Sequence, residues 1–240
     1  MATDYLILSL LTGTLGFILW YALSPSLRLP KSFQIQYDVN SSYFSRILRR
    51  RLLGAFLFGG VPLLMVFWFK WLGDISLVDL GISFAWSPAV GYWLLGLLPV
   101  TLLFNFLSTR GRAHLLEYPE IRLTCWTPLM CICSAFFWLL YLVGMEFLFR
   151  GMVLQSVFMN TGSTWLALLV STGMYGMIHY FKNNRISVGS IPYGLIMAYA
   201  TLESGSLLPT IIVHVVGAWT TEWTALYLHP EVRVQRQLYD

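Results

Sequence analysis

A glutamate and an arginine stand four residues apart in an otherwise apolar stretch of the chain. They are Glu146 and Arg150, and residues 123–145 before them contain no Asp, Glu, Lys or Arg. A charge at bilayer depth costs about 2.5–3.5 kcal/mol on insertion scales, so an ionisable pair there is a functional-site hypothesis by default. Because a helix places residues four apart on one face, each side chain is expected to neutralise the other.

Two later apolar segments each contain one internal histidine. They are His179, which follows Tyr175 by one helical turn, and His214. An intramembrane hydrolase needs a general base to activate water and donors for the developing oxyanion. Glu146 is the candidate base, and Tyr175 is placed to orient His179. The two histidines are candidates for a second acid or base and for an oxyanion donor.

Each of these residues also has a structural interpretation. A single histidine in an apolar helix often hydrogen-bonds a backbone carbonyl or a hydroxyl, and a Glu–Arg pair at helical spacing can hold two spans together. Two histidines and a glutamate would suit zinc, but the HExxH spacing is absent. We therefore expect neither a metal nor another cofactor.

The composition is that of a polytopic membrane protein. Of 240 residues, 57% are hydrophobic and only 11% are charged, whereas about 25% are charged in soluble domains. The net charge of +4 is concentrated in loops, which indicates membrane topology and contact with anionic lipid instead of nucleic acid. The length fits one integral membrane domain, residues 1–240, folded as an all-α transmembrane helical bundle of about seven spans.

Charge-free apolar stretches predict the spans, at about 20 residues per crossing. The first lacks the features of a cleavable signal peptide and is expected to remain as a span. Tilt, a kink near Gly144 or Gly151, or a short re-entrant piece is expected, because the apolar run over 126–158 is too long for one perpendicular crossing. The predicted helices are residues 5–27, 52–69, 91–108, 125–149, 164–181, 190–202, which is short, and 207–228.

Basic residues predict which loops are cytoplasmic. Residues 28–51 contain six Lys and Arg against one Asp, so the positive-inside rule places this loop in the cytoplasm and the N-terminus outside. Residues 74–88 contain two aspartates and no Lys or Arg, and are expected outside. Residues 109–122 then return the chain to the cytoplasm. We interpret the triplet Arg49–Arg51 as a topological anchor, with a specific lipid or partner site as the alternative.

Three ordered motifs resemble those of the CPBP family of intramembrane glutamic endopeptidases, which includes the type II CAAX prenyl proteases. The family's EExxFRG stands here as MEFLFRG at 145–151, its FxxxH as YGMIH at 175–179, and its GSLxPxIxxH run with HxxxN as GSLLPTIIVHVVGA at 205–218. The resemblance covers a motif core at 125–220. It implies a CPBP-like bundle in the bacterial cytoplasmic (inner) membrane and an endopeptidase that acts on a membrane-associated peptide or protein.

Two positions depart from these motifs. The first glutamate, to which the resemblance assigns the activation of water, is Met145, and the closing asparagine, an oxyanion-site donor, is Ala218. The chain is thus either a variant protease relying on Glu146 or a pseudo-protease that serves as a membrane scaffold, chaperone or immunity-type binding protein. A small transporter is a third alternative, without an evident inverted repeat. Glu222, two turns beyond His214, is either a substitute carboxylate or an interfacial residue.

Overall fold

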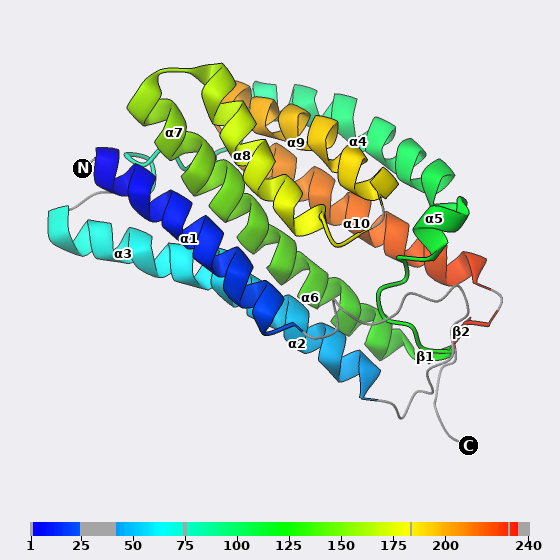
Figure 1. Cartoon of the computed structure of the whole chain (residues 1–240). Helices are drawn as coiled ribbons and strands as arrows, with labels where there is room; N and C mark the ends of the chain where they lie inside the picture. The colour runs from blue at the N-terminus through cyan, green and yellow to red at the C-terminus, as the bar shows by residue number, and fades with distance from the viewer. Residues whose placement is uncertain (1, 25–41, 74–75, 183, 230, 235–240) are drawn as a thin grey trace.

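The computed structural model describes residues 2–24, 42–73, 76–182, 184–229 and 231–234 and shows a helical bundle (Figure 1). Two of its segments, η2 and η3, are π-helical. The elements are α1 (Ala2–Ala22), α2 (Tyr43–Ala55), η2 (Phe56–Gly60), α3 (Val61–Gly73), α4 (Pro88–Thr109), α5 (Arg112–Leu115), β1 (Cys125–Trp126), α6 (Pro128–Glu146), η3 (Phe147–Val153), α7 (Leu154–Thr161), α8 (Thr164–His179), α9 (Asn184–Ser204), α10 (Leu208–Leu228) and β2 (Arg233–Val234).

Four of the described helical stretches are long and apolar enough to cross a membrane. They span residues 3–22, 43–71, 88–109 and 128–161. The prediction of an all-α integral membrane protein is confirmed, but the expected count of about seven spans is not. The last three helices lack the length or the hydropathy of a membrane span. α8 has only 16 residues. α9 and α10 are less apolar because they contain many Ser, Thr and Tyr residues, and α10 also contains His214 and Glu222.

Two predicted helix starts differ from the structure. The second long helix begins at Tyr43, so Arg49–Arg51 lies on α2 and not in a loop, and the earlier part of the predicted loop, residues 25–41, lies outside the described residues. Near the other end of the chain, α9 begins at Asn184 and runs for 21 residues, whereas the sequence predicted a short helix. α9 contains Pro192, which a bundle tolerates when neighbouring helices satisfy the freed backbone groups.

The two longest helices each contain a π-helical segment, and these segments lie close together. The η3 segment includes Gly151, so the irregularity expected near Gly144 or Gly151 is present as a π-helical stretch in a continuous helix. A Cβ added to Gly59, in η2, would lie only 2.9 Å from the Cα of Gly144. Glycine at both positions is what lets the two backbones approach, as small residues commonly do between membrane helices.

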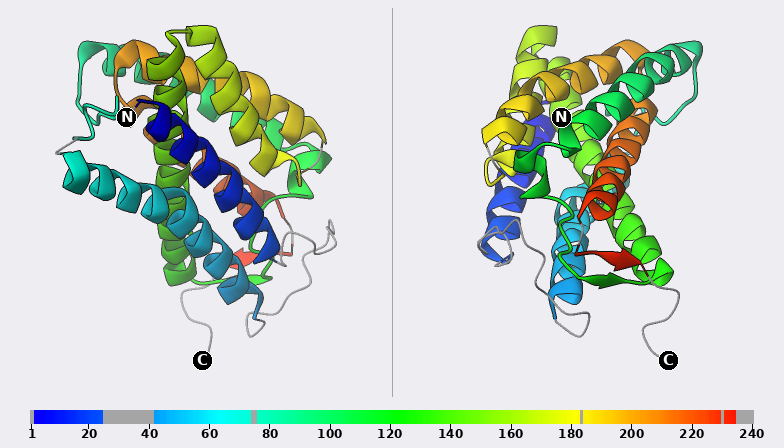
Figure 2. Two further views of the ribbon diagram at one scale, coloured as in Figure 1. Left: turned by 60° about the vertical axis from the view of Figure 1, so that its left-hand side comes forward. Right: turned by 90° about the vertical axis from the view of Figure 1, so that its right-hand side faces the viewer.

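The helices pack so that widely separated parts of the chain enclose one interior. α10 packs along α4, α8 along α9, and α2 along α6, and the views from further directions show the same neighbours (Figure 2). The two-residue strands β1 and β2 pair in parallel, Cys125 with Arg233, near the end of the bundle opposite the N-terminus (Figure 1). Residues from both halves of the chain therefore reach the interior.

Basic side chains gather at the β1–β2 end of the bundle. Ion pairs join Arg50 of α2 and Lys182 after α8 to Glu120 in the loop after α5. At the opposite end, the hydroxyl of Tyr5 donates to the backbone oxygen of Leu80, which places the N-terminal helix beside the 76–87 loop. The basic residues of α2 and of the segment after α8 therefore lie at the β1–β2 end, away from the 76–87 loop.

Cysteine labelling tests the orientation that this asymmetry predicts. In a variant lacking the three native cysteines, an impermeant thiol reagent applied to intact cells is expected to label Ala85→Cys at the acidic end. Ser45→Cys at the basic end is expected to react only after permeabilisation, because the positive-inside rule places the basic end in the cytoplasm. Both positions are exposed. Strong labelling of Ser45→Cys in intact cells would reverse the orientation.

Candidate functional site

A cavity of about 810 Å³ lies among α2, α4, α6, α8, α9 and α10. Three of the predicted site residues, Tyr175, His179 and His214, line it, as do Met145 and Ala218 at the two positions that depart from the motifs. Segments that lie far apart in the sequence thus form one pocket, and its size suits a peptide segment or another ligand of that scale.

Glu146 lies behind the cavity wall and reaches the cavity through His214. Its Oε1 is 3.2 Å from Nη1 of Arg150 and 2.6 Å from Nδ1 of His214. The side chains of Glu146 and Arg150 are both 0% exposed, and neither lines the cavity. The predicted Glu146–Arg150 pair is confirmed, while the group that a water molecule in the cavity would meet is the imidazole of His214.

The partners of His214 fix which of its ring nitrogens carries the proton. A carboxylate only accepts hydrogen bonds, so Nδ1 of His214 donates to Glu146, and in the neutral ring Nε2 is left as an acceptor. Nε2 lies 3.5 Å from the hydroxyl of Tyr175. The ring of Tyr193, from α9, stands edge-on to the imidazole with centroids 5.9 Å apart. Sequence reasoning missed Tyr193; a tyrosine directly after Pro192 in a predicted helix was the available signal.

Tyr175 contacts three of the other four predicted residues. Its ring lies 4.0 Å from the guanidinium carbon of Arg150, and its ring centroid is 4.7 Å from that of His179. Nδ1 of His179 lies 3.4 Å from the backbone oxygen of Tyr175. Tyr175 therefore contacts His179 through its ring and backbone, while its hydroxyl approaches His214. The five residues predicted from the motifs converge on one site.

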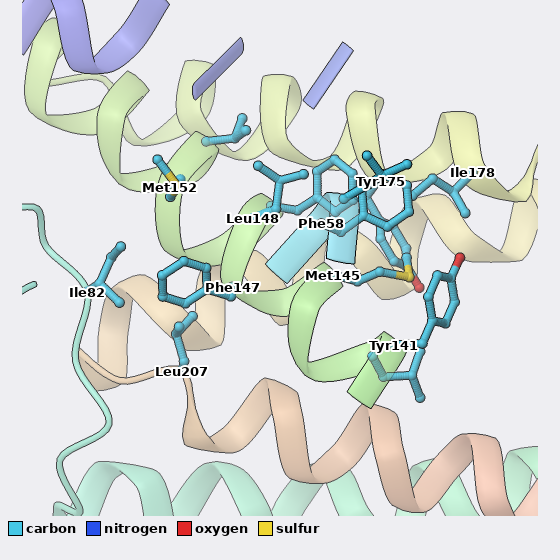
Figure 3. Close-up of a cluster of buried hydrophobic side chains, with 14 of the residues drawn as sticks. Phe58, Ile82, Tyr141, Met145, Phe147, Leu148, Met152, Tyr175, Ile178 and Leu207 are labelled. Atoms are coloured by element: carbon cyan, nitrogen blue, oxygen red, sulfur yellow. The ribbon is translucent and has the colours of Figure 1, made fainter. Parts of the chain in front are cut away.

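The two departing positions place apolar groups on the cavity wall. Met145 is 1% exposed and belongs to a hydrophobic cluster with Phe58, Tyr141 and Tyr175 (Figure 3). Ala218 packs against the same cluster. A thioether and a methyl group can neither take up a proton nor donate a hydrogen bond to an oxyanion. Any proton transfer in this part of the cavity therefore depends on the histidines and tyrosines.

Residues 124–220 match the family model described as "Type II CAAX prenyl endopeptidase Rce1-like". These residues are similar to that family, and we refer to them as the Rce1-like segment. The resemblance predicted from the three motifs is confirmed over this segment. No curated protein and no solved structure matches the chain. Within the described ranges, no group of three or more His, Cys, Asp and Glu side chains could hold a metal ion.

A network of charged residues outside the Rce1-like segment closes the basic end of the cavity. Arg51 is 1% exposed, and its Nη2 lies 3.3 Å from carboxylate oxygens of both Glu120 and Glu222. Its Nη1 donates to the hydroxyl of Ser134 at 2.8 Å. Arg51 therefore has a structural role in addition to the topological one, which stays a prediction for Arg49–Arg51. Glu222 is buried against Arg51.

Glu120 joins this network to the Rce1-like segment. Arg50 contacts one of its oxygens at 2.5 Å and Lys182 the other at 3.5 Å. Lys182 also donates to the hydroxyl of Tyr118 at 2.6 Å. Burial alone raises the pKa of Glu120, but Arg50, Lys182 and Arg51 together lower it to about 2. Its pairing therefore stabilises the fold above the pKa of an unfolded glutamate, about 4.3, and this contribution is lost as pH falls towards 2.

Proposed function

We propose that the chain is an intramembrane endopeptidase in which His214 accepts the proton of the attacking water. The observation that carries this proposal is the 2.6 Å contact between Nδ1 of His214 and the enclosed carboxylate of Glu146, which leaves Nε2 as the proton acceptor of a cavity-lining residue. A histidine whose second nitrogen is held by a carboxylate is the arrangement used by general bases in acyl transfer. The Rce1-like match favours a membrane-associated peptide or protein as substrate.

In the proposed reaction, His214, Glu146 and Arg150 each have a role. The oxygen of a water molecule attacks the scissile carbonyl carbon, and the proton of that water passes to Nε2 of His214. The C–N bond then breaks, and the departing amine takes this proton, so His214 returns to its neutral state. The charge of Glu146 stabilises the imidazolium that forms in between, and Arg150 holds Glu146 in place.

A second candidate function is binding without hydrolysis. The observation that favours it is that Met145 and Ala218, both on the cavity wall, supply no polar group where the resembled family has two. In this reading the Rce1-like segment binds a membrane-associated peptide or protein as a scaffold, chaperone or immunity-type protein. The ion pairs around Glu146 and Arg51 then serve stability alone.

A cleavage assay separates the two candidates. The protein purified in detergent is incubated with a library of membrane peptides, and products are identified by mass spectrometry. Wild type is expected to cleave, and His214→Gln is expected to lower turnover about 10²–10⁴-fold, the usual cost of losing a general base. Absence of wild-type turnover, with cleavage by a Met145→Glu, Ala218→Asn double variant, would instead identify a pseudo-protease.

We also propose seven crossings in a bacterial cytoplasmic (inner) membrane, with lipid as a partner. With α2–α3 and α6–α7 each counted once, the helices α1, α4, α8, α9 and α10 bring the total to seven. α9 and α10 have 21 residues each, about 30 Å at 1.5 Å per residue, which matches the hydrocarbon thickness of a bilayer. Large apolar side chains such as Leu95 and Phe104 are exposed on α4, where lipid would cover them.

A further inference from the structure

We propose that Asn105 of α4 donates the hydrogen bond that stabilises the oxyanion, replacing the carboxamide absent at Ala218. The inference rests on the proposed endopeptidase function. Asn105 lies outside the Rce1-like segment, and it lines the same cavity as His214 and Ala218. It is the one carboxamide side chain among the described residues that line this cavity.

The hydrogen bonding of Asn105 leaves a donor for a substrate. Its Nδ2 donates to the backbone oxygen of Gly217 at 3.0 Å. A carboxamide nitrogen carries two N–H donors, and the second has no partner in the described part of the chain. Because the amide nitrogen is anchored on α10 one residue before Ala218, its remaining N–H is held near the position that lacks a donor. A neutral N–H fixed in advance is what an oxyanion site requires.

Gly217 is what allows α4 to bring this amide to α10. A Cβ at Gly217 would lie 3.1 Å from Nδ2 of Asn105 and 3.0 Å from Cγ2 of Thr101, closer than most side-chain contacts. The backbone oxygen of Gly217 also accepts a hydrogen bond from the hydroxyl of Thr221 at 3.1 Å. Asn105 is therefore not needed to satisfy this carbonyl, and the close fit serves to position the amide.

Several other polar groups on the cavity wall are occupied. Arg50, Arg51 and Lys182 are paired with carboxylates at the basic end. The hydroxyl of Tyr175 approaches Nε2 of His214, where the attacking water must lie. In the reaction, the carbonyl oxygen becomes the oxyanion when water attacks and accepts the free N–H of Asn105. Asn105 transfers no proton, and its hydrogen bond weakens when the C–N bond breaks and the carbonyl reforms.

Relocating the carboxamide tests the proposal. Asn105→Leu keeps the number and branching of the side-chain heavy atoms but removes both donors, and it is expected to lower kcat about 10²-fold, the lower range for loss of one oxyanion donor, with KM changed less than about threefold. Adding Ala218→Asn to Asn105→Leu is expected to raise kcat at least about tenfold above that of Asn105→Leu alone, because a carboxamide then enters the cavity from α10. Asn160→Ala, exposed on α7, is the matched control and is expected to retain wild-type kcat.

The outcomes separate this inference from the function on which it rests. Wild-type turnover that depends on His214 but survives Asn105→Leu overturns the role of Asn105 and leaves the endopeptidase intact. A loss of kcat that Ala218→Asn does not restore, in a variant with an unchanged melting temperature, also overturns it. If Asn105→Leu fails to fold, Asn105→Ala is measured in the same way. Absence of turnover in the wild type overturns both proposals.

Discussion

Arg51→Leu is expected to lower the free energy of unfolding by about 3–5 kcal/mol, because it leaves the carboxylate of Glu222 buried without its counter-charge. Arg49→Leu is the matched control: it lies two residues earlier on the same helix, is exposed, and is expected to change stability by less than about 0.5 kcal/mol. The measurement is an unfolding equilibrium in mixed micelles, followed by the loss of helical circular dichroism.

A third variant shows whether the loss comes from the unpaired charge. Removing both partners with Arg51→Leu and Glu222→Leu is expected to recover part of the stability, because no buried charge is then left alone at this contact. Glu120 retains Arg50 and Lys182 in that variant. Equal losses from Arg49→Leu and Arg51→Leu would contradict the assigned role of the network.

Glu146→Gln is expected to lower kcat about 10²–10⁴-fold in the same cleavage assay. The glutamine amide can donate to Nδ1 of His214, which favours the tautomer with its proton on Nε2 and so removes the acceptor for water. It also provides no charge to stabilise the imidazolium. Because the change leaves Arg150 buried without a counter-charge, the melting temperature falls as well.

A surface control and a stability measurement separate these two effects. Glu203→Gln makes the same chemical change on an exposed part of α9 and is expected to keep wild-type kcat. Turnover of Glu146→Gln is measured well below its own melting temperature, where the folded protein can be quantified. Cleavage at the wild-type rate under these conditions would rule out the Glu146–His214 pair as the catalytic unit.

The sequence predicted which residues meet at the site, but not which of them contact the cavity. Motif order and helical spacing were enough to bring Glu146, Arg150, Tyr175, His179 and His214 together. Helical periodicity says that two residues share a face, yet it does not say whether that face meets a cavity or another helix. The packing of α6 against α10 brings Glu146 to His214 and leaves the imidazole of His214 at the cavity wall.

Partners that are distant in the chain were beyond sequence reasoning. Arg49, Arg50 and Arg51 have identical side chains, and the phase of α2 alone decides which one is buried. The partner of Arg51, Glu222, is 171 residues away. Asn105 left a weak signal that was not used: it is an isolated carboxamide in an apolar helix, and polar groups at that depth are generally held by a partner.

The π-helical segment η3 also makes the chain tolerant of a shortening at this point. A π turn contains one more residue than an α turn, so loss of a single residue from η3 would let this stretch become regular α-helix while α7 keeps its orientation. Leu154 and Val157, which are buried among α8 and α9, would then stay in their packing. The same deletion within a regular helix such as α10 would rotate the helix residues beyond it by about 100°, so a one-codon deletion is expected to be better tolerated in η3 than there.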